Sequence, residues 1–299
     1  MLTPAQYADR YRSLEVPFDD GAETVRVEQY RRGDPKPGSA HAKDDLWQGL
    51  KDHFQEHQRH DKTWQLTLHV NSGTKAFASP QTLSGHVARP YYGKGSPEDC
   101  QIVLQLAVLV AKKHKPRKNQ ADLQKYCDTH LGLDCNGFVG NYLWHERAGN
   151  AWDVDPGHKD VGPSSTIDSI MKAGHFISKI GDMNAAKMHL LAQVDGANVI
   201  IPGGARVGHI TVTEPNRYMS QSFVFNSFGG LDLRMATRQQ IYGHPAYWVV
   251  ESTGGKGLVE SWYAFQPVHD KRGKDVPGVF KVFRGSKGSE LTVRVSELG

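Results

Sequence analysis

Cysteine, histidine and glutamate occur in this chain in contexts that suit nucleophilic catalysis. Cys135 follows Gly132, which ends one element, and precedes Phe138 and Tyr142 at helical spacing. The spacing predicts that Cys135 lies in the first turn of a helix. There the helix dipole and the backbone N–H groups stabilise a thiolate and can bind an oxyanion. Cys135 is therefore the candidate nucleophile.

A thiolate of this kind needs a base that accepts its proton and later protonates the leaving group. His209 follows Gly208 at the start of a strand-like run, residues 208–213. A histidine at a strand start can face a helix N-terminus that packs on the sheet. Glu251 closes the apolar run 246–250 directly before a turn, and a carboxylate there can orient the imidazole. The sequence therefore predicts a Cys135–His209–Glu251 triad.

Residues near the three candidates have other expected roles, and several residues are alternatives to His209 and Glu251. Asp134 stands beside the thiol, where its charge opposes thiolate formation, so we expect it to serve structure or substrate binding. Gly137 would let a substrate backbone approach closely. Cys100 and Cys127 fall inside expected helices and are expected to be packed. The rival bases are His145, His158, His175 and His189, and the alternates to Glu251 are Glu260 and Asn226.

Helices come first and strands follow, which predicts an α+β chain. Apolar spacing and capping residues predict helices, a hairpin at 64–78, and loops at 31–41, 79–96 and 147–163. The expected helices span 3–14, 44–59, 96–113, 119–130, a segment from 135 onward and 165–173. The expected strands span 197–201, 208–213, 221–228, 246–251, 258–265, 279–283 and 291–295.

Composition narrows the classes of function. The chain has 299 residues, a net charge of +4 and three cysteines, so we expect neither a disulfide framework nor a nucleic-acid partner. The basic cluster at 112–118 is expected to be a solvated helix end. His53, His57 and His60 share one helical face that could surround a metal, but we expect them to form a solvated polar face. We expect no metal and no organic cofactor.

Targeting signals are also informative. The first twenty residues contain no apolar core typical of a Sec signal, and no run of about 18 apolar residues occurs. We therefore expect a protein made in the cytoplasm that does not span a membrane. Any export would use a specialised secretion or lysis route.

The segment Asp134-Cys135-Asn136-Gly137-Phe138-Val139 resembles the DCSGFV-type motif of the NlpC/P60 peptidases, with Asn136 in place of serine. Residues 194–201 resemble the family's PGD strand entry, residues 208–210 resemble its HVGI strand, and residues 249–252 resemble its IHA strand. The resemblance covers roughly residues 97–265. It implies that His209 is the catalytic base and that Glu251 occupies the position of the third triad residue.

The chain departs from the family in three places. The family's Tyr-x-Trp-Gly-Gly stretch before the cysteine has no counterpart at residues 124–127. About thirty residues, roughly 215–245, stand where the family has a tight turn. Asn136 replaces a residue that in the family helps to bind the free amine of the substrate, so the resemblance places Asp134, Asn136 and Gly137 at the substrate.

The resemblance implies a papain-like core with an N-terminal extension. We expect residues 1–95 to form an accessory region and residues 96–299 a catalytic domain that cleaves an amide bond in peptidoglycan stem peptides. A toxin delivered to rival cells would need a protective immunity protein as a partner. The alternatives are a papain-like acyltransferase or lipid deacylase, and a binding module with a vestigial site.

Overall fold

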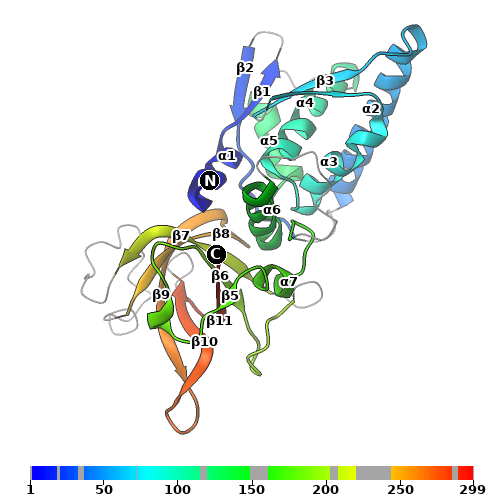
Figure 1. Cartoon of the computed structure of the whole chain (residues 1–299). Helices are drawn as coiled ribbons and strands as arrows, with labels where there is room; N and C mark the ends of the chain where they lie inside the picture. The colour runs from blue at the N-terminus through cyan, green and yellow to red at the C-terminus, as the bar shows by residue number, and fades with distance from the viewer. Residues whose placement is uncertain are drawn as a thin grey trace. The chain divides into compact units, whose positions relative to one another are not determined.

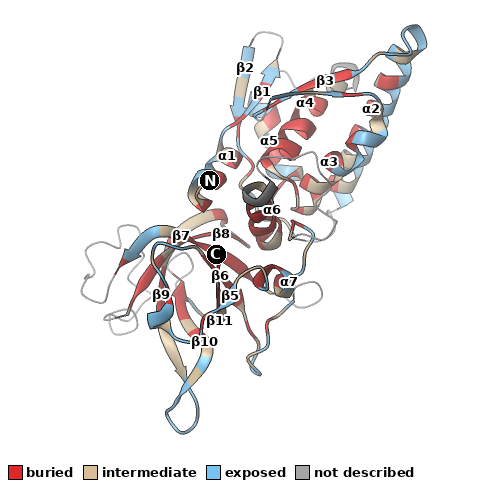
Figure 2. Ribbon diagram, in the orientation of Figure 1, coloured by how far each residue is buried: buried red, intermediate tan, exposed pale blue. Residues whose placement is uncertain are grey.

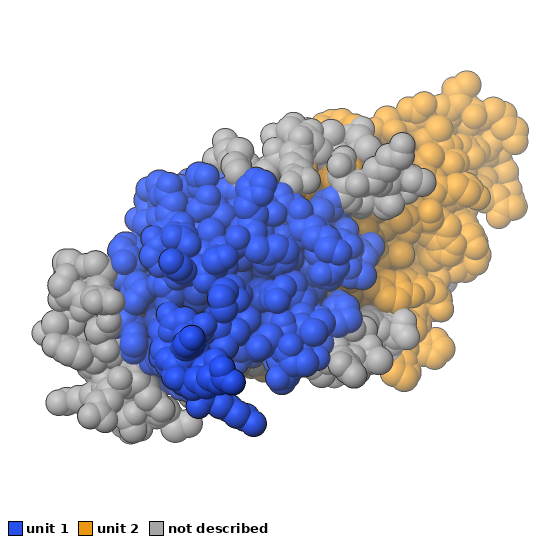
Figure 3. All heavy atoms as spheres, turned by 60° about the horizontal axis from the view of Figure 1, so that its bottom comes forward, with its two compact units in different colours: residues 1–6, 156–251, 259–299 blue, residues 7–155, 252–258 orange. Residues whose placement is uncertain are grey.

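The computed structural model describes residues 2–18, 21–32, 37–71, 73–114, 120–148, 161–202, 208–219, 244–284 and 289–298. The chain has an α+β fold (Figure 1). It divides into two compact units, coloured separately in Figure 3. Unit 1 comprises residues 1–6, 156–251 and 259–299, and unit 2 comprises residues 7–155 and 252–258.

Unit 2 contains most of the helices and two small hairpins. Most of α1 also belongs to unit 2. Its elements are α1 (Pro4–Arg12), β1 (Leu14–Phe18), β2 (Gly21–Val25), α2 (Pro37–His60), β3 (Leu66–Val70), β4 (Gly73–Phe77), η1 (Pro80–Leu83), α3 (Ser84–Ala88), η2 (Arg89–Tyr92), α4 (Pro97–His114), α5 (Gln120–His130) and α6 (Cys135–Ala148).

Helix α4 is the centre of unit 2. It packs against β1, α2, α3 and β3, and its side chains at 102, 103, 104 and 106 have no exposed surface. In Figure 2 this helix is coloured mainly as buried. A reciprocal cap begins it, because the Asp99 backbone N–H donates to Ser96 Oγ (3.1 Å) and the Ser96 N–H donates to Asp99 Oδ2 (3.0 Å). Because α4 packs on elements that precede it, residue 95 does not separate the two units.

Several expectations for unit 2 need correction. Helix α2 begins at Pro37, inside the loop expected at 31–41, since proline suits the first helical turn. The loop expected at 79–96 contains three short helical turns, and Pro80 and Pro90 begin two of them. The sequence does not predict hairpin β1–β2, because Pro17 interrupts the very short alternation of apolar and polar residues in β1. The helices at 3–14, 96–113 and 119–130 and the hairpin at 64–78 are confirmed within a few residues.

Unit 1 is a sheet that closes on itself. Its strands are ordered β10-β9-β8-β7-β6-β11-β5, and β10 also pairs with β11. The strands are β5 (His175–Phe176), β6 (His189–Gln193), β7 (Ile210–Met219), β8 (Ala246–Thr253), β9 (Gly257–His269), β10 (Asp275–Arg284) and β11 (Ser289–Glu297), and α7 (Ile167–Met171) precedes them. The last two residues of β8 and the first two of β9 belong to unit 2.

Alternate residues of these strands fill the interior of the closed sheet. Tyr247 and Val249 of β8 meet Phe265 of β9 and Val282 of β10 in one buried cluster. Successive side chains of a strand point to opposite faces. Glu251, Tyr263 and Arg284 therefore continue the inward-facing series toward one end of the sheet.

The strand predictions succeed in part. The expected strand at 197–201 is absent, because Val194 and Ile200 form only an isolated bridge around a turn. The sequence analysis did not predict strand β6, which lies just before the strand expected at 197–201. The strands expected at 208–213, 246–251, 258–265, 279–283 and 291–295 are present and mostly longer. The predictions at His158, Asn226 and 221–228 fall outside the described residues.

Candidate functional site

Cys135 is the first residue of α6, as the sequence predicts. Asp134 caps this helix, because its carboxylate accepts a hydrogen bond from the Gly137 backbone N–H. The thiol side chain is nearly buried, and its Sγ lies 3.4 Å from Asn136 Oδ1. The thiol therefore occupies the position in a helix where the dipole favours a negative charge.

The Asp134 carboxylate also forms an ion pair with Lys94, whose Nζ lies 2.8 Å from Oδ2. Burial raises the pKa of Asp134, and the opposing effects of Lys94 and the Gly137 N–H are smaller. The contacts found for this carboxylate thus lie within the chain. Its expected role in substrate binding stays a prediction.

Gly137 is a point of close approach, although the group that approaches is the chain's own backbone. A side-chain carbon at Gly137 would collide with the Gly93 carbonyl oxygen. Gly93 itself has φ +76°, and a side chain there would meet the Arg31 carbonyl oxygen at 2.6 Å. These two glycines let the start of α6 pack directly on the turn that contains Lys94.

Tyr30 is a neighbour of this motif that the sequence analysis missed. It forms a parallel bridge with Leu133, two residues before Cys135. Burial, followed by the charges of Cys135 and Asp134, raises the pKa of Tyr30 to about 12, so the phenol stays protonated at neutral pH. Tyr30 lies in a stretch without helical or strand periodicity, so no sequence signal marks it.

His209 and Glu251 form a close pair in unit 1. His209 Nε2 lies 2.7 Å from Glu251 Oε2, Glu251 has no exposed surface and His209 is 9% exposed. The pairing of Val212 with Val250 places Thr211 opposite Glu251. His209 is two residues earlier on the same face, within diagonal reach across the strands. The sequence therefore predicted a partner that the sheet register brings into contact.

Two further residues surround Glu251, and the sequence analysis missed both. Arg284 Nη2 donates to Glu251 Oε2 at 2.7 Å, and Arg284 Nε donates to the Tyr263 hydroxyl at 2.8 Å. Burial lowers the pKa of Arg284, but Tyr263 and Glu251 together raise it above its usual value. The only sequence signal for these residues is the alternation of side chains along a strand, and Arg284 directly follows the strand expected at 279–283.

The rival bases have other surroundings. Burial, aided by Arg10, lowers the pKa of His145 to about 4, and its ring packs on Tyr7. His175 is exposed on β5. His189 is fully buried, with its ring Nδ1 3.4 Å from Thr213 Oγ1.

The alternates to the triad's cysteine and glutamate also have structural surroundings. Glu260 accepts a hydrogen bond from the Trp248 indole N–H at 2.9 Å. Cys100 and Cys127 are buried as expected, and burial raises the pKa of Cys100 well above that of a free thiol.

Unit 2 contains a second histidine–carboxylate pair. His86 Nδ1 lies 2.6 Å from Asp99 Oδ1, and Arg89 contacts both oxygens of the same carboxylate at 2.7 and 2.8 Å. Burial acts to raise the pKa of Asp99, but Arg89 and His86 together lower it to about 2. This cluster joins α3 and η2 to the start of α4.

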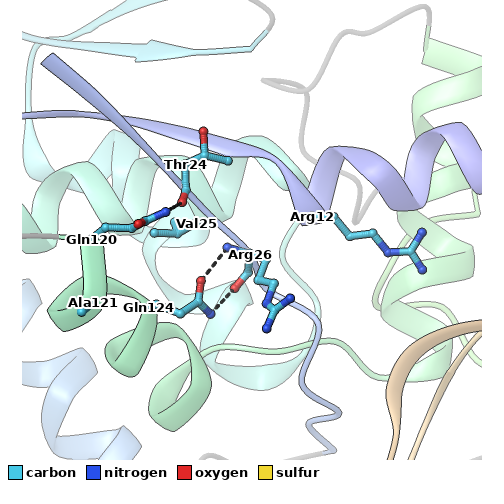
Figure 4. A pocket seen from close by; sticks show the side chains of 7 residues that line it. All are labelled: Arg12, Thr24, Val25, Arg26, Gln120, Ala121 and Gln124. Atoms are coloured by element: carbon cyan, nitrogen blue, oxygen red, sulfur yellow. Dashed lines mark hydrogen bonds between the residues drawn. The ribbon is translucent and has the colours of Figure 1, made fainter.

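A hollow of about 380 Å³ opens elsewhere in unit 2 (Figure 4). The Gln124 side-chain amide accepts a hydrogen bond from the Arg26 backbone N–H and donates one to the Arg26 carbonyl, each at 2.9 Å. A neighbouring strand would pair with Arg26 in the same way. Glu28 contacts both guanidinium groups of the hollow, Arg12 Nε at 3.1 Å and Arg26 Nε at 3.5 Å. The hollow is lined by Arg12, Thr24, Val25, Arg26, Gln120, Ala121 and Gln124.

Comparison of the chain with protein-family models, with curated proteins and with solved structures finds no match. Within the described ranges, no group of three or more His, Cys, Asp or Glu side chains could hold a metal ion. No helix in those ranges is both long and apolar enough to cross a membrane. The candidate chemistry therefore depends on Cys135 in unit 2 and on His209 and Glu251 in unit 1.

Proposed function

We propose that the protein is a cysteine hydrolase that cleaves an amide bond with Cys135 as nucleophile, His209 as base and Glu251 as the residue that orients the base. The observation that carries the proposal is the buried contact between His209 Nε2 and Glu251 Oε2 at 2.7 Å. A fully buried carboxylate on an imidazole is the arrangement that fixes the tautomer and orientation of a catalytic histidine. The position of Cys135 at the start of α6 supports the same reading.

In the first half of the reaction, Glu251 holds Nε2, so Nδ1 of His209 takes the proton from Cys135. The Cys135 sulfur attacks the amide carbonyl carbon, and the carbonyl oxygen becomes an oxyanion that backbone N–H groups at the start of α6 stabilise. The tetrahedral intermediate then collapses. The C–N bond breaks, His209 protonates the leaving amine, and the acyl group stays on Cys135 as a thioester.

In the second half, His209 takes a proton from a water molecule, whose oxygen attacks the thioester carbonyl. The C–S bond breaks and the proton returns to the Cys135 sulfur, which releases a carboxylic acid and regenerates the thiol. Every proton in this cycle passes through His209. The cycle uses neither a metal ion nor an organic cofactor.

The quoted motifs support peptidoglycan stem peptides as the substrate and a papain-like arrangement as the core. The papain-like core is part of this proposal, as are the substrate-binding roles of Asp134, Asn136 and Gly137. If the enzyme acts as a toxin on other cells, the producing cell needs an immunity protein that blocks it. Purification with the products of neighbouring genes tests that partner.

The first experiment incubates purified peptidoglycan with the wild type, Cys135→Ala and the matched control Cys127→Ala. Mass spectrometry identifies the soluble fragments. Fragments from the wild type and Cys127→Ala, but none from Cys135→Ala, support the proposal and identify the bond. No fragments from any wall type reject the wall substrate. Release of fatty acid from acyl esters would then support the lipid deacylase alternative.

A second experiment tests whether Cys135 and His209 act together, as the reaction requires. Alkylation of Cys135 by iodoacetamide is measured against pH in the wild type and in His209→Ala. A thiol paired with an imidazole forms its thiolate at lower pH, so we expect the variant to react about tenfold more slowly near pH 6. Equal rates in both proteins, or a wild-type Cys135 no faster than Cys127, would support the vestigial binding module.

A further inference from the structure

Two side chains contact the same carboxylate oxygen of Glu251. His209 Nε2 and Arg284 Nη2 both lie 2.7 Å from Glu251 Oε2. Arg284 is held in turn by the Tyr263 hydroxyl, which accepts from its Nε at 2.8 Å. Glu251 and Tyr263 have no exposed surface, and Arg284 is 8% exposed.

This arrangement requires three strands of the closed sheet. Glu251 lies on β8, Tyr263 on β9 and Arg284 at the end of β10, where the register pairs it directly with Tyr263. Two hydrogen bonds therefore fix the guanidinium, because Arg284 is bound at both its Nε and its Nη2. Moving the guanidinium away from the carboxylate would break the hydrogen bond from Nη2 to Glu251.

We propose that Arg284 and Tyr263 are positioning residues that limit, through Glu251, how readily His209 takes a proton. The inference deepens the proposed function and rests on it for its catalytic meaning.

The same cation limits how strongly Glu251 attracts a proton to His209. An imidazole beside an isolated carboxylate gains proton affinity, and a nearby guanidinium opposes that gain. With neutral His209, the charges of Glu251 and Arg284 cancel, and Tyr263 adds no charge because burial raises its pKa. A base whose pKa lies near the pH at which the enzyme works transfers protons in both directions most effectively.

The test measures the titration of the His209 ring by NMR in a Cys135→Ala background, which keeps the thiol out of the experiment. We expect Arg284→Met to raise the pH at which His209 titrates by about one unit, because the opposing charge is gone. Arg284→Lys should shift it less. Lys281→Met removes a charge from the exposed side of β10 and should leave His209 unchanged.

A His209 that titrates at the same or a lower pH in folded Arg284→Met overturns the inference. If that variant does not fold, Tyr263→Phe supplies the test, since it removes one of the two bonds that hold Arg284. There we expect a smaller shift in the same direction, and no shift overturns the inference. Because the readout needs no activity, a protein without amidase activity can still show the shift, and an active amidase can still lack it.

Discussion

Each of the two units contains a carboxylate that contacts both a histidine and an arginine, but the two clusters are assembled differently. In unit 2, His86 and Asp99 are 13 residues apart, and Arg89 lies on the next turn after His86. In unit 1, 42 residues separate His209 from Glu251, and 33 more separate Glu251 from Arg284. The first cluster is local in sequence, whereas the second depends on the sheet.

The difference indicates a difference in role. Asp99 also accepts from the Ser96 N–H, so its carboxylate is committed to the start of α4 and to Arg89 through both oxygens. Glu251 uses one oxygen for both His209 and Arg284. The local cluster joins α3 and η2 to the start of α4, whereas the proposed function gives the sheet cluster the role of positioning a catalytic imidazole. Four predictions, from the largest expected effect to the smallest, test this distinction.

Replacing the two histidines should separate the roles most clearly. We expect His209→Ala to reduce amide hydrolysis by about a thousandfold or more, because every proton transfer passes through it. His86→Ala should leave the rate per folded molecule nearly unchanged. The measurement is fragment release from peptidoglycan at matched concentrations of folded protein. A comparable loss of activity in His86→Ala would contradict the distinction.

Replacing the two carboxylates should separate an effect on stability alone from an effect on both stability and activity. Asp99→Asn leaves Arg89 and His86 without a buried counter-charge, and breaking such a pair costs about 3 kcal/mol. Denaturant unfolding measures the loss, and Asp195→Asn, at an exposed turn, is the matched control. Glu251→Gln should lose activity as well as stability. An Asp99→Asn protein as stable as the wild type would remove the structural role.

The pH dependence of unfolding should report Asp99. Its pKa is about 2 in the folded chain and 3.8 when free. Because the folded value is lower, its contribution is fully present above pH 4 and is lost as the pH falls toward 2. The difference corresponds to about 2 kcal/mol. Denaturant midpoints between pH 5 and 2 measure it, and Asp99→Asn should flatten that slope relative to the wild type.

The smallest effect concerns the cap shared with the local cluster. Ser96→Ala removes the hydroxyl that accepts from the Asp99 N–H, and losing such a cap costs about 1 kcal/mol. Activity should not change. Ser96→Thr keeps a hydroxyl and should recover most of the stability. A Ser96→Ala midpoint equal to the wild type would show that the Asp99 carboxylate alone maintains the helix start.

The sequence was informative where the signals are local. Capping residues and apolar spacing predicted a helix at 96–113, which matches α4, and the apolar spacing after Cys135 placed that residue at the start of α6. Glu251 was selected as the partner of His209 because it ends an apolar run before a turn. The contact between them supports that choice of geometry, while its catalytic role stays a prediction.

What the sequence did not indicate depends on pairing between distant segments. Arg284 and Tyr263 join Glu251 only through the register of β8, β9 and β10, which no short motif encodes. Tyr30 reaches the Cys135 motif through a single bridge to Leu133. His86 and Arg89 were hidden in a stretch read as a loop, because two prolines suggested breaks and instead begin short helical turns.

The interleaving of the two units along the chain has a consequence for synthesis on the ribosome. Residues 252–258 belong to unit 2, where the Ser252 hydroxyl donates to the Leu133 carbonyl at 2.8 Å and the Leu258 N–H donates to the Glu28 carbonyl at 2.8 Å. Translation proceeds from the N-terminus at about 5–20 residues per second. Several seconds therefore pass between the synthesis of residue 155 and that of residues 252–258. If translation stalls in that interval, the carbonyls of Leu133 and Glu28 lack these two hydrogen bonds.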